Sequence, residues 1–166
     1  KVTANMSAYT SRNLEIGQLD TILNQSSCFY STLDEKTSRH IHMALGEKDT
    51  FKQFLYYFLF IERYTHSVYK KINYDMDGAS LLNIPARLNI TATAFMKERQ
   101  LEARNLRQRF IWCSILKWNE VSDQDIDDFK EIKKIRDEIS HGENVNISEL
   151  PINKTKALAL KLLSMH

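Results

Sequence analysis

The scarcity of glycine and proline constrains the fold of this chain more than any other feature of its sequence. The 166 residues include four glycines and two prolines, whereas average usage predicts about 20 for the two types together. A fold with many tight turns needs these residues, because they supply the backbone conformations that such turns require. The chain is therefore expected to form long helices with few connections.

The composition is that of a soluble globular domain. Hydrophobic residues make up 43% of the chain and charged residues 27%, a balance that excludes a disordered tail. Lys and Arg number 23 against 21 Asp and Glu, so the formal net charge is only +2. Binding to nucleic acid, if it occurs, must therefore come from local clusters of charge.

Three features predict a cytoplasmic protein with no membrane partner. The longest apolar stretch, residues 54–61, is much shorter than the roughly 20 residues of a membrane-spanning helix. No basic start followed by a small-residue cleavage site opens the chain, as a secretory signal would. Cys28 and Cys113 lie far apart and are expected to be free thiols in a reducing compartment.

Hydrophobic periodicity predicts an all-α fold, an up-and-down bundle of about five or six helices. Apolar residues recur at three- and four-residue spacings in the most apolar segment, which is expected to form the central helix after an N-cap at Thr50. Residues 73–93 are expected to form a loop with a helical turn around Leu81 and Leu82. Helices are predicted over residues 34–45, 51–72, 94–118, 122–142 and 154–164, with a further amphipathic one within residues 1–34.

A single helical domain, residues 1–166, is expected, in which residues 51–166 form the core and residues 1–50 an N-terminal extension. The clearest helix boundary in the core begins at Ser122, which forms a capping box with Asp125. Isoleucine and phenylalanine then recur every three or four residues as far as Gly142, which suits the left-handed position after a helix.

Several kinds of site have no support in the sequence. The four glycines are scattered, so no loop can cradle a phosphate, and no serine or cysteine lies in a nucleophile elbow. No Cys-x-x-Cys or His-Glu-x-x-His motif occurs, and His40 and His42 lie about 200° apart on a helix. Neither a metal nor another cofactor is therefore expected.

The residues best suited to catalysis lie at the end of the helix that is predicted to begin at Ser122. Arg136 has a planar, permanent charge that suits phosphate oxygens, and His141 can exchange a proton near neutral pH. Asp137 precedes His141 by four residues and lies on the same helical face, where its carboxylate can orient the ring. Arg136 and His141 point about 140° apart on an ideal helix. Either the helix unwinds near Gly142, or a second copy of the chain supplies its own pair.

The residues from Thr50 to His166 resemble the HEPN family (higher eukaryotes and prokaryotes nucleotide-binding). The family signature is Arg, four to six residues, then His, near the end of a late helix, and Arg136 and His141 match it. Residues 109–142 look like the last two core helices of the family, and residues 58–63 look like its aromatic first helix, with Glu62 as the acidic residue.

The resemblance implies a homodimeric helical bundle and a metal-independent endoribonuclease, often a toxin of a toxin–antitoxin pair or an antiviral effector. By position, His141 would transfer protons at the ribose 2′-hydroxyl or the leaving 5′-oxygen, and Arg136 would stabilise charge on the phosphate, leaving a 2′,3′-cyclic phosphate. Asp137 replaces the Asn that often follows the signature Arg, and its negative charge weakens RNA affinity. The family variant that places a Tyr two residues after the His is not matched, because Glu143 stands there.

Supporting roles follow from charge and position. Arg104, Arg107 and Lys133 are predicted to bind RNA, and Glu62 is a candidate for lining the site, although support of the core is its commoner use. His66 is expected to pack or to lie at the surface, and Trp118 is expected to pack in the core or to anchor a dimer interface. Two alternatives stay open: a catalytically inactive helical module that binds a protein or a nucleotide, and a toxin held by an antitoxin.

Overall fold

The structure is a computed structural model, and it describes residues 33–73 and 85–165. The chain divides into two compact units, Lys1–Leu33 and Asp34–His166, and the described helices all belong to the second. The amphipathic helix predicted within residues 1–34 and the turn predicted around Leu81 and Leu82 lie outside the described residues.

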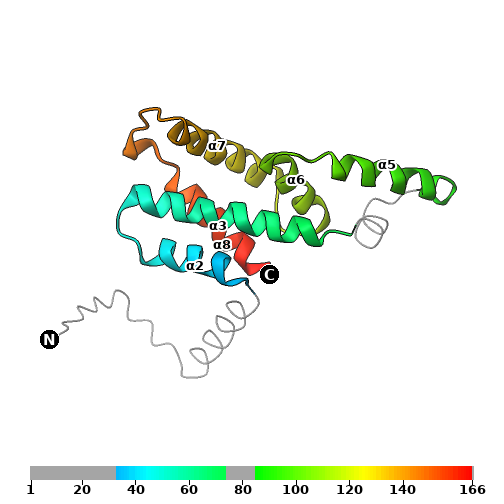
Figure 1. Cartoon of the computed structure of the whole chain (residues 1–166), viewed down its shortest axis with the longest axis horizontal. Helices are drawn as coiled ribbons and strands as arrows, with labels where there is room; N and C mark the ends of the chain where they lie inside the picture. Colours follow the sequence, from blue (N-terminus) through cyan, green and yellow to red (C-terminus); the bar gives the residue numbers. More distant parts are fainter. Residues whose placement is uncertain (1–32, 74–84, 166) are drawn as a thin grey trace, which may run out of the picture. The chain divides into compact units, whose positions relative to one another are not determined.

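All regular structure in the described residues is helical, which confirms the all-α prediction (Figure 1). Two short 3₁₀ turns, Ala86–Leu88 and Ile147–Glu149, accompany the longer helices. The α-helices are α2 (Glu35–Gly46), α3 (Thr50–Lys71), α5 (Asn89–Leu101), α6 (Leu106–Leu116), α7 (Asp123–Ser140) and α8 (Ile152–Ser164).

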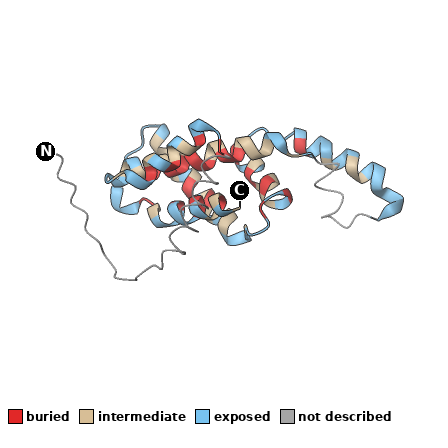
Figure 2. Ribbon diagram, turned by 90° about the horizontal axis from the view of Figure 1, so that it is seen from below, coloured by how far each residue is buried: buried red, intermediate tan, exposed pale blue. Residues whose placement is uncertain are grey.

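Helix α3 is the centre of the bundle, as its apolar sequence predicts. Helices α2, α6, α7 and α8 all pack against it, and Figure 2 shows the buried residues gathered where these helices meet. Helix α2 packs along much of α3 and belongs to the same compact unit as residues 51–166. The bundle therefore includes part of the segment expected to be an N-terminal extension.

Stacked aromatic rings join α3, α6 and α7 in the core. The rings of Phe110 and Phe129 stack with centroids 4.0 Å apart, and the edge of Trp118 meets Phe110 at 5.2 Å. Trp118 also stacks on Tyr64 of α3 at 5.8 Å. Because large rings bury much apolar area and gain further from these geometries, this cluster fixes how α7 sits on α3. The expectation that Trp118 serves packing is confirmed, since it is 1% exposed.

The helix predicted over residues 94–118 is wrong, because the chain breaks it after Leu101 and starts α6 at Leu106. Asn105 caps the new helix by accepting a hydrogen bond from the Gln108 N–H at 2.9 Å, while the Gln108 side chain accepts from the Asn105 N–H. This capping box satisfies backbone donors that would otherwise have no partner. Phe95 of α5 is 52% exposed.

The predicted helix termini are mostly where the sequence places them. The capping box of Ser122 with Asp125 and the left-handed Gly142, with φ of 78°, are both confirmed. The predicted N-cap of α3 is one residue too late: the Asp49 carboxylate accepts from the Lys52 N–H at 2.9 Å, and Thr50 is already helical. A carboxylate at this position also interacts favourably with the helix dipole.

Candidate functional site

The end of α7 holds the backbone of His141 firmly and leaves its side chain exposed. The His141 N–H donates to the Asp137 carbonyl oxygen at 2.9 Å, and the Glu143 N–H donates back to the Glu138 carbonyl oxygen at 3.0 Å. These bonds, with the positive φ of Gly142, form a compact helix end. The imidazole of His141 has no hydrogen bond or ion pair within the described part of the chain, so it is free to act on a ligand.

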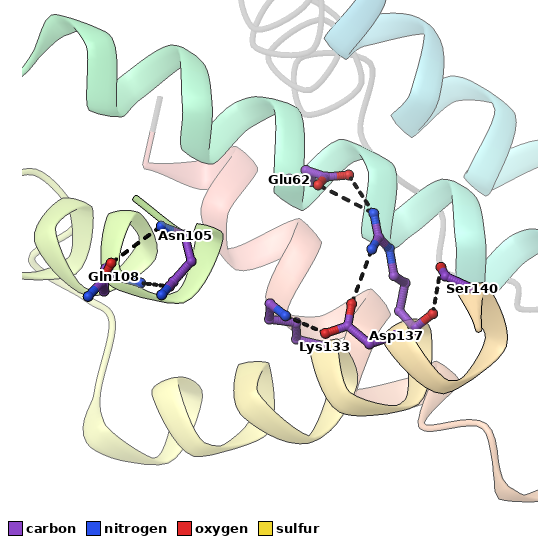
Figure 3. A network of polar contacts seen from close by, with 7 residues as sticks. Glu62, Asn105, Gln108, Lys133, Asp137 and Ser140 are labelled. Carbon is purple, nitrogen blue, oxygen red and sulfur yellow. Dashed lines mark hydrogen bonds and ion pairs between the residues drawn. The ribbon is translucent and has the colours of Figure 1, made fainter. Parts of the chain in front are cut away.

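Figure 3 shows Glu62 of α3 and Asp137 of α7 on facing helices, and both are bound by Arg136 of α7. Nη2 of Arg136 lies 3.4 Å from Oε2 of Glu62, and Nη1 of Arg136 donates to Oδ1 of Asp137 at 3.1 Å. The guanidinium carbon also lies 5.0 Å from the ring centroid of Phe58, a cation–π contact. The side chain is 30% exposed. Arg136 is therefore held at the contact between α7 and α3 by two carboxylates and a ring.

Asp137 binds two cations. Its Oδ2 accepts from Nζ of Lys133 and its Oδ1 from Arg136. Burial raises the pKa of Asp137, but the hydrogen bonds and charges of Lys133 and Arg136 lower it by more than burial raises it. The pKa of Asp137 therefore lies below the ordinary 3.8. The carboxylate is thus charged at neutral pH. Both oxygens of Asp137 bind these cations. No hydrogen bond joins the Asp137 carboxylate to the imidazole of His141, although the sequence predicted that this carboxylate would orient the ring.

A hollow of about 340 Å³, which we call the His141 hollow, lies beside the end of α7. Four residues predicted from the sequence line it together: Arg107 of α6, and Lys133, Asp137 and His141 of α7 and its cap. The structure thus brings together residues 26 to 34 positions apart in the chain. The remaining lining residues are two further lysines and two further carboxylates, Lys130, Lys134, Glu138 and Glu143.

Charge in the His141 hollow is mixed, and its cations differ in how far they are neutralised. Lys133 is paired with Asp137, and Nζ of Lys134 lies 3.6 Å from Oε1 of Glu138. Arg107 is exposed and pairs with no carboxylate among the described residues. An anion that enters the hollow therefore meets the guanidinium of Arg107 and the imidazole of His141 as its two uncommitted partners.

The other predicted site residues lie elsewhere. Arg136 and Glu62 bind each other and do not line the His141 hollow, and Arg104 lies exposed in the break between α5 and α6. Helix α7 is regular through Ser140, so it does not unwind to bring Arg136 and His141 together. Within one chain, the two signature residues face different neighbours.

One cluster escaped sequence reasoning. Nη1 of Arg109 lies 3.1 Å from Nδ1 of His66, a residue expected only to pack or lie at the surface, and both line a second hollow with Arg63, Lys70 and Lys71 of α3. The signal that could have found it is the spacing of three, four and seven residues among Arg63, His66 and Lys70, which places them on one helical face.

Other chemistry finds little support in residues 33–73 and 85–165. No group of three or more His, Cys, Asp or Glu side chains is arranged there to hold a metal ion. Burial raises the pKa of the Cys113 thiol to about 12, so this cysteine stays protonated and is a poor nucleophile. None of the described helices has the length and apolar character that crossing a membrane requires.

No model of a protein family, no curated protein and no solved structure matches this chain.

Proposed function

We propose that this chain is a cytoplasmic, metal-independent endoribonuclease of the HEPN type that works as a homodimer. The observation that carries the proposal is the His141 hollow, which is lined by an exposed imidazole on a fixed backbone and by the guanidinium of Arg107, which pairs with no carboxylate of the described residues. An imidazole titrates near neutral pH and a guanidinium matches phosphate oxygens. An imidazole can therefore take the proton of a ribose 2′-hydroxyl, and the guanidinium of Arg107 can hold a phosphate of the RNA beside it.

In the proposed reaction His141 removes the proton from the ribose 2′-hydroxyl. The 2′-oxygen attacks phosphorus, the bond from phosphorus to the 5′-oxygen breaks, and the leaving 5′-oxygen takes up the proton that His141 has received, which restores the neutral imidazole. The products are a 2′,3′-cyclic phosphate and a 5′-hydroxyl. Arg107 and Lys133 hold neighbouring phosphates, and Lys133 gains freedom to do so as a phosphate competes with Asp137.

Arg136 stabilises the charge that develops on the phosphate. Its guanidinium has five N–H donors, and Glu62 and Asp137 occupy only Nη1 and Nη2, so donors remain for a phosphate. Because α7 stays helical between Arg136 and His141, the proposal pairs Arg136 of one protomer with His141 of the other across a twofold axis. The role of Glu62 is to position Arg136.

Incubation of labelled RNA with the purified chain in EDTA tests the proposal. We expect cleavage with a cyclic phosphate on the 5′ fragment, and loss of cleavage in His141→Ala. The matched control is His42→Ala, which removes another exposed histidine, on α2, and should leave cleavage unchanged. Equal activity of His141→Ala and the unaltered chain would refute the catalytic role.

A mixture of two inactive variants tests the homodimer. When His141→Ala and Arg136→Ala chains exchange subunits, a site built from Arg136 of one chain and His141 of the other is intact once per mixed dimer. We expect the mixture to regain up to about a quarter of the original activity, since half of the dimers are mixed and each has one of two sites. No recovery, with mixed dimers confirmed by mass, would place both residues in the same chain's site.

The structure also supports a second candidate, a catalytically inactive helical interaction module. The observation in its favour is that Arg136 is bound by Glu62, Asp137 and the ring of Phe58, which are the contacts of a structural arginine. RNA that stays intact in EDTA, together with strong destabilisation by Arg136→Ala, would favour this module. Toxicity on expression, relieved by a neighbouring gene product, would instead favour a ribonuclease toxin with an antitoxin partner.

A further inference from the structure

From a basic surface along α2 and α3 we infer that the chain binds the phosphate backbone of single-stranded RNA at a second place, separate from the His141 hollow. We call this surface the basic track. It consists of two hollows that share Arg63 and have no residue in common with the His141 hollow. The choice of RNA as the nucleic acid rests on the proposed function, whereas the binding of a phosphate backbone rests on the track alone.

The first hollow, of about 600 Å³, is rich in cations. Arg63, Lys70 and Lys71 of α3 and Arg109 of α6 line it, together with His66 and Ser67. Its one carboxylate, Asp34, is already engaged, because it caps α2 by accepting from the N–H of Thr37 at 3.1 Å and from the hydroxyl of the same residue at 2.5 Å. The hollow thus offers several positive charges and little to neutralise them.

Arg109 is held in place for binding. Its Nε donates to the Ala103 carbonyl oxygen at 3.1 Å, and its guanidinium carbon lies 5.4 Å from the ring centroid of Tyr69. Because an arginine has no acceptor, the 3.1 Å contact with His66 requires that Nδ1 of His66 accepts and that Nε2 carries the proton. Burial and the charge of Arg109 lower the pKa of His66, which favours this neutral form. Arg109 and His66 therefore both present N–H donors, with no carboxylate in salt-bridge contact.

The second hollow has a volume of about 350 Å³, and no carboxylate of the described residues lines it. Lys36, Arg39 and His40 of α2 face Tyr56 and Arg63 of α3 across it. Nε of Arg63 and Nδ1 of His40 are buried and have no hydrogen-bond partner in the described part of the chain. A buried polar group without a partner is unfavourable, and an anion in the hollow would interact favourably with the positive charge of Arg63.

The shape of the basic track favours a strand over a compact anion. Arg63 joins the two hollows, and Lys71 follows Arg63 by eight residues, which is about 12 Å along the helix, so the cations follow a line. Phosphates repeat along a strand in the same way, and positive grooves with an aromatic side chain are how proteins bind single strands without reading their sequence. Tyr56 supplies a ring in the second hollow. An acidic protein is the competing ligand class, and the test includes it.

Binding is measured by fluorescence anisotropy with a labelled 2′-O-methyl oligoribonucleotide of about 20 residues, long enough to cover several phosphate contacts, which the proposed reaction cannot cleave because its 2′-oxygen is blocked. The track variant is Arg39→Gln, Lys70→Gln, Lys71→Gln, which changes exposed residues only. The control is Lys48→Gln, Lys52→Gln, Lys156→Gln, which removes the same charge from exposed residues outside both hollows. Thermal unfolding confirms that both variants are folded.

We expect the track variant to bind at least about tenfold more weakly and its plot of log affinity against log salt to lose about 2 from its slope, at about 0.7 for each phosphate contact. The control should keep the slope of the unaltered chain. Equal weakening in both variants would overturn the inference, because binding would then follow net charge alone. Equally tight binding of polyglutamate, lost in the same variant, would also overturn it in favour of an acidic protein.

His141→Ala separates this inference from the proposed function. If the track is a distinct site, the track substitutions weaken oligonucleotide binding as much in His141→Ala as they do in the unaltered chain. Loss of binding in His141→Ala would overturn the separate track. Absence of cleavage by the unaltered chain, with binding that depends on the track, would overturn the ribonuclease and leave the track in place.

Discussion

Arg136 and His141 lie five residues apart at the end of α7, yet the first side chain is packed against another helix and the second is exposed. Arg136 is packed against Phe58 and bound by Glu62 of α3, whereas His141 is exposed and faces the hollow that Arg107 of α6 helps to line. A resemblance in sequence treats the two as one pair. In the structure, the guanidinium of Arg136 joins α7 to α3, whereas the imidazole of His141 has no partner among the described residues.

The geometry of the helix explains this difference. Arg136 follows Phe129 by seven residues and Ile132 by four, so it extends the buried stripe of α7. Lys130, Lys133 and Asp137 follow one another at intervals of three and four, and His141 continues this second face into the hollow. One helix therefore serves packing with one face and offers charged groups to a ligand with the next.

The largest expected effect is that of His141→Ala on cleavage. Loss of a general acid or base lowers the rate by about 10²- to 10⁴-fold, and we expect this loss in the cleavage rate under single-turnover conditions. The midpoint of thermal unfolding should stay the same, because the side chain is exposed and has no partner among the described residues. A large drop in the midpoint would show that His141 has a structural role, as Arg136 does.

Arg136→Ala should change both quantities. We expect a fall of about 10²- to 10³-fold in cleavage, the usual effect of removing a group that stabilises charge in the transition state. We also expect the free energy of unfolding to fall by about 1–2 kcal/mol, as a half-buried ion pair and a cation–π contact are lost. Urea unfolding measures the second effect, and the control is Arg87→Ala, which removes an arginine that is exposed. If the free energy of unfolding of Arg136→Ala equalled that of the unaltered chain, Arg136 would have no structural role that distinguishes it from His141.

Gly142→Ala tests the helix end that holds His141. An L side chain at a φ of 78° costs about 1–2 kcal/mol, although a Cβ there meets no atom within 4 Å. We expect the free energy of unfolding to fall by about 1 kcal/mol in urea titrations. The control is Gly46→Ala in the last turn of α2, where φ is not positive, and there alanine should be neutral or slightly stabilising. Equal effects at the two glycines would mean that Gly142 does not depend on its left-handed backbone.

Asp137→Asn, at a position between Arg136 and His141, should have the smallest effect on the free energy of unfolding. Because the pKa of Asp137 is lower in the folded chain than in the unfolded chain, its charge stabilises the fold above about pH 4, and this contribution is lost as the pH falls through the folded pKa. The variant should be less stable by under about 1 kcal/mol near pH 6, since the side chain is partly exposed. The difference should disappear once the pH lies below the folded pKa of Asp137, because the carboxyl group is then protonated in both states. A constant difference across the pH range would assign the effect to packing and not to charge.

Local signals are predicted well because they depend on residues close in sequence. The cap at Ser122 and the turn at Gly142 each follow from a few neighbouring residues, and both are confirmed. The break after Leu101 was missed, because the apolar spacing that predicted one long helix outweighed the capping pair of Asn105 and Gln108. The sequence does contain the signal for this pair, because a polar cap followed three residues later by Glu or Gln is typical of a helix start.

The sequence by itself determined which residues share a face of each helix, including the separation of Arg136 from His141 around α7. Only the tertiary structure decided which faces meet: Arg136 binds Glu62, 74 residues away, and Arg109 contacts His66, 43 residues away. The reason is physical. Helix periodicity arises from backbone hydrogen bonds four residues apart, whereas the meeting of two helices depends on how their side chains fill the shared core.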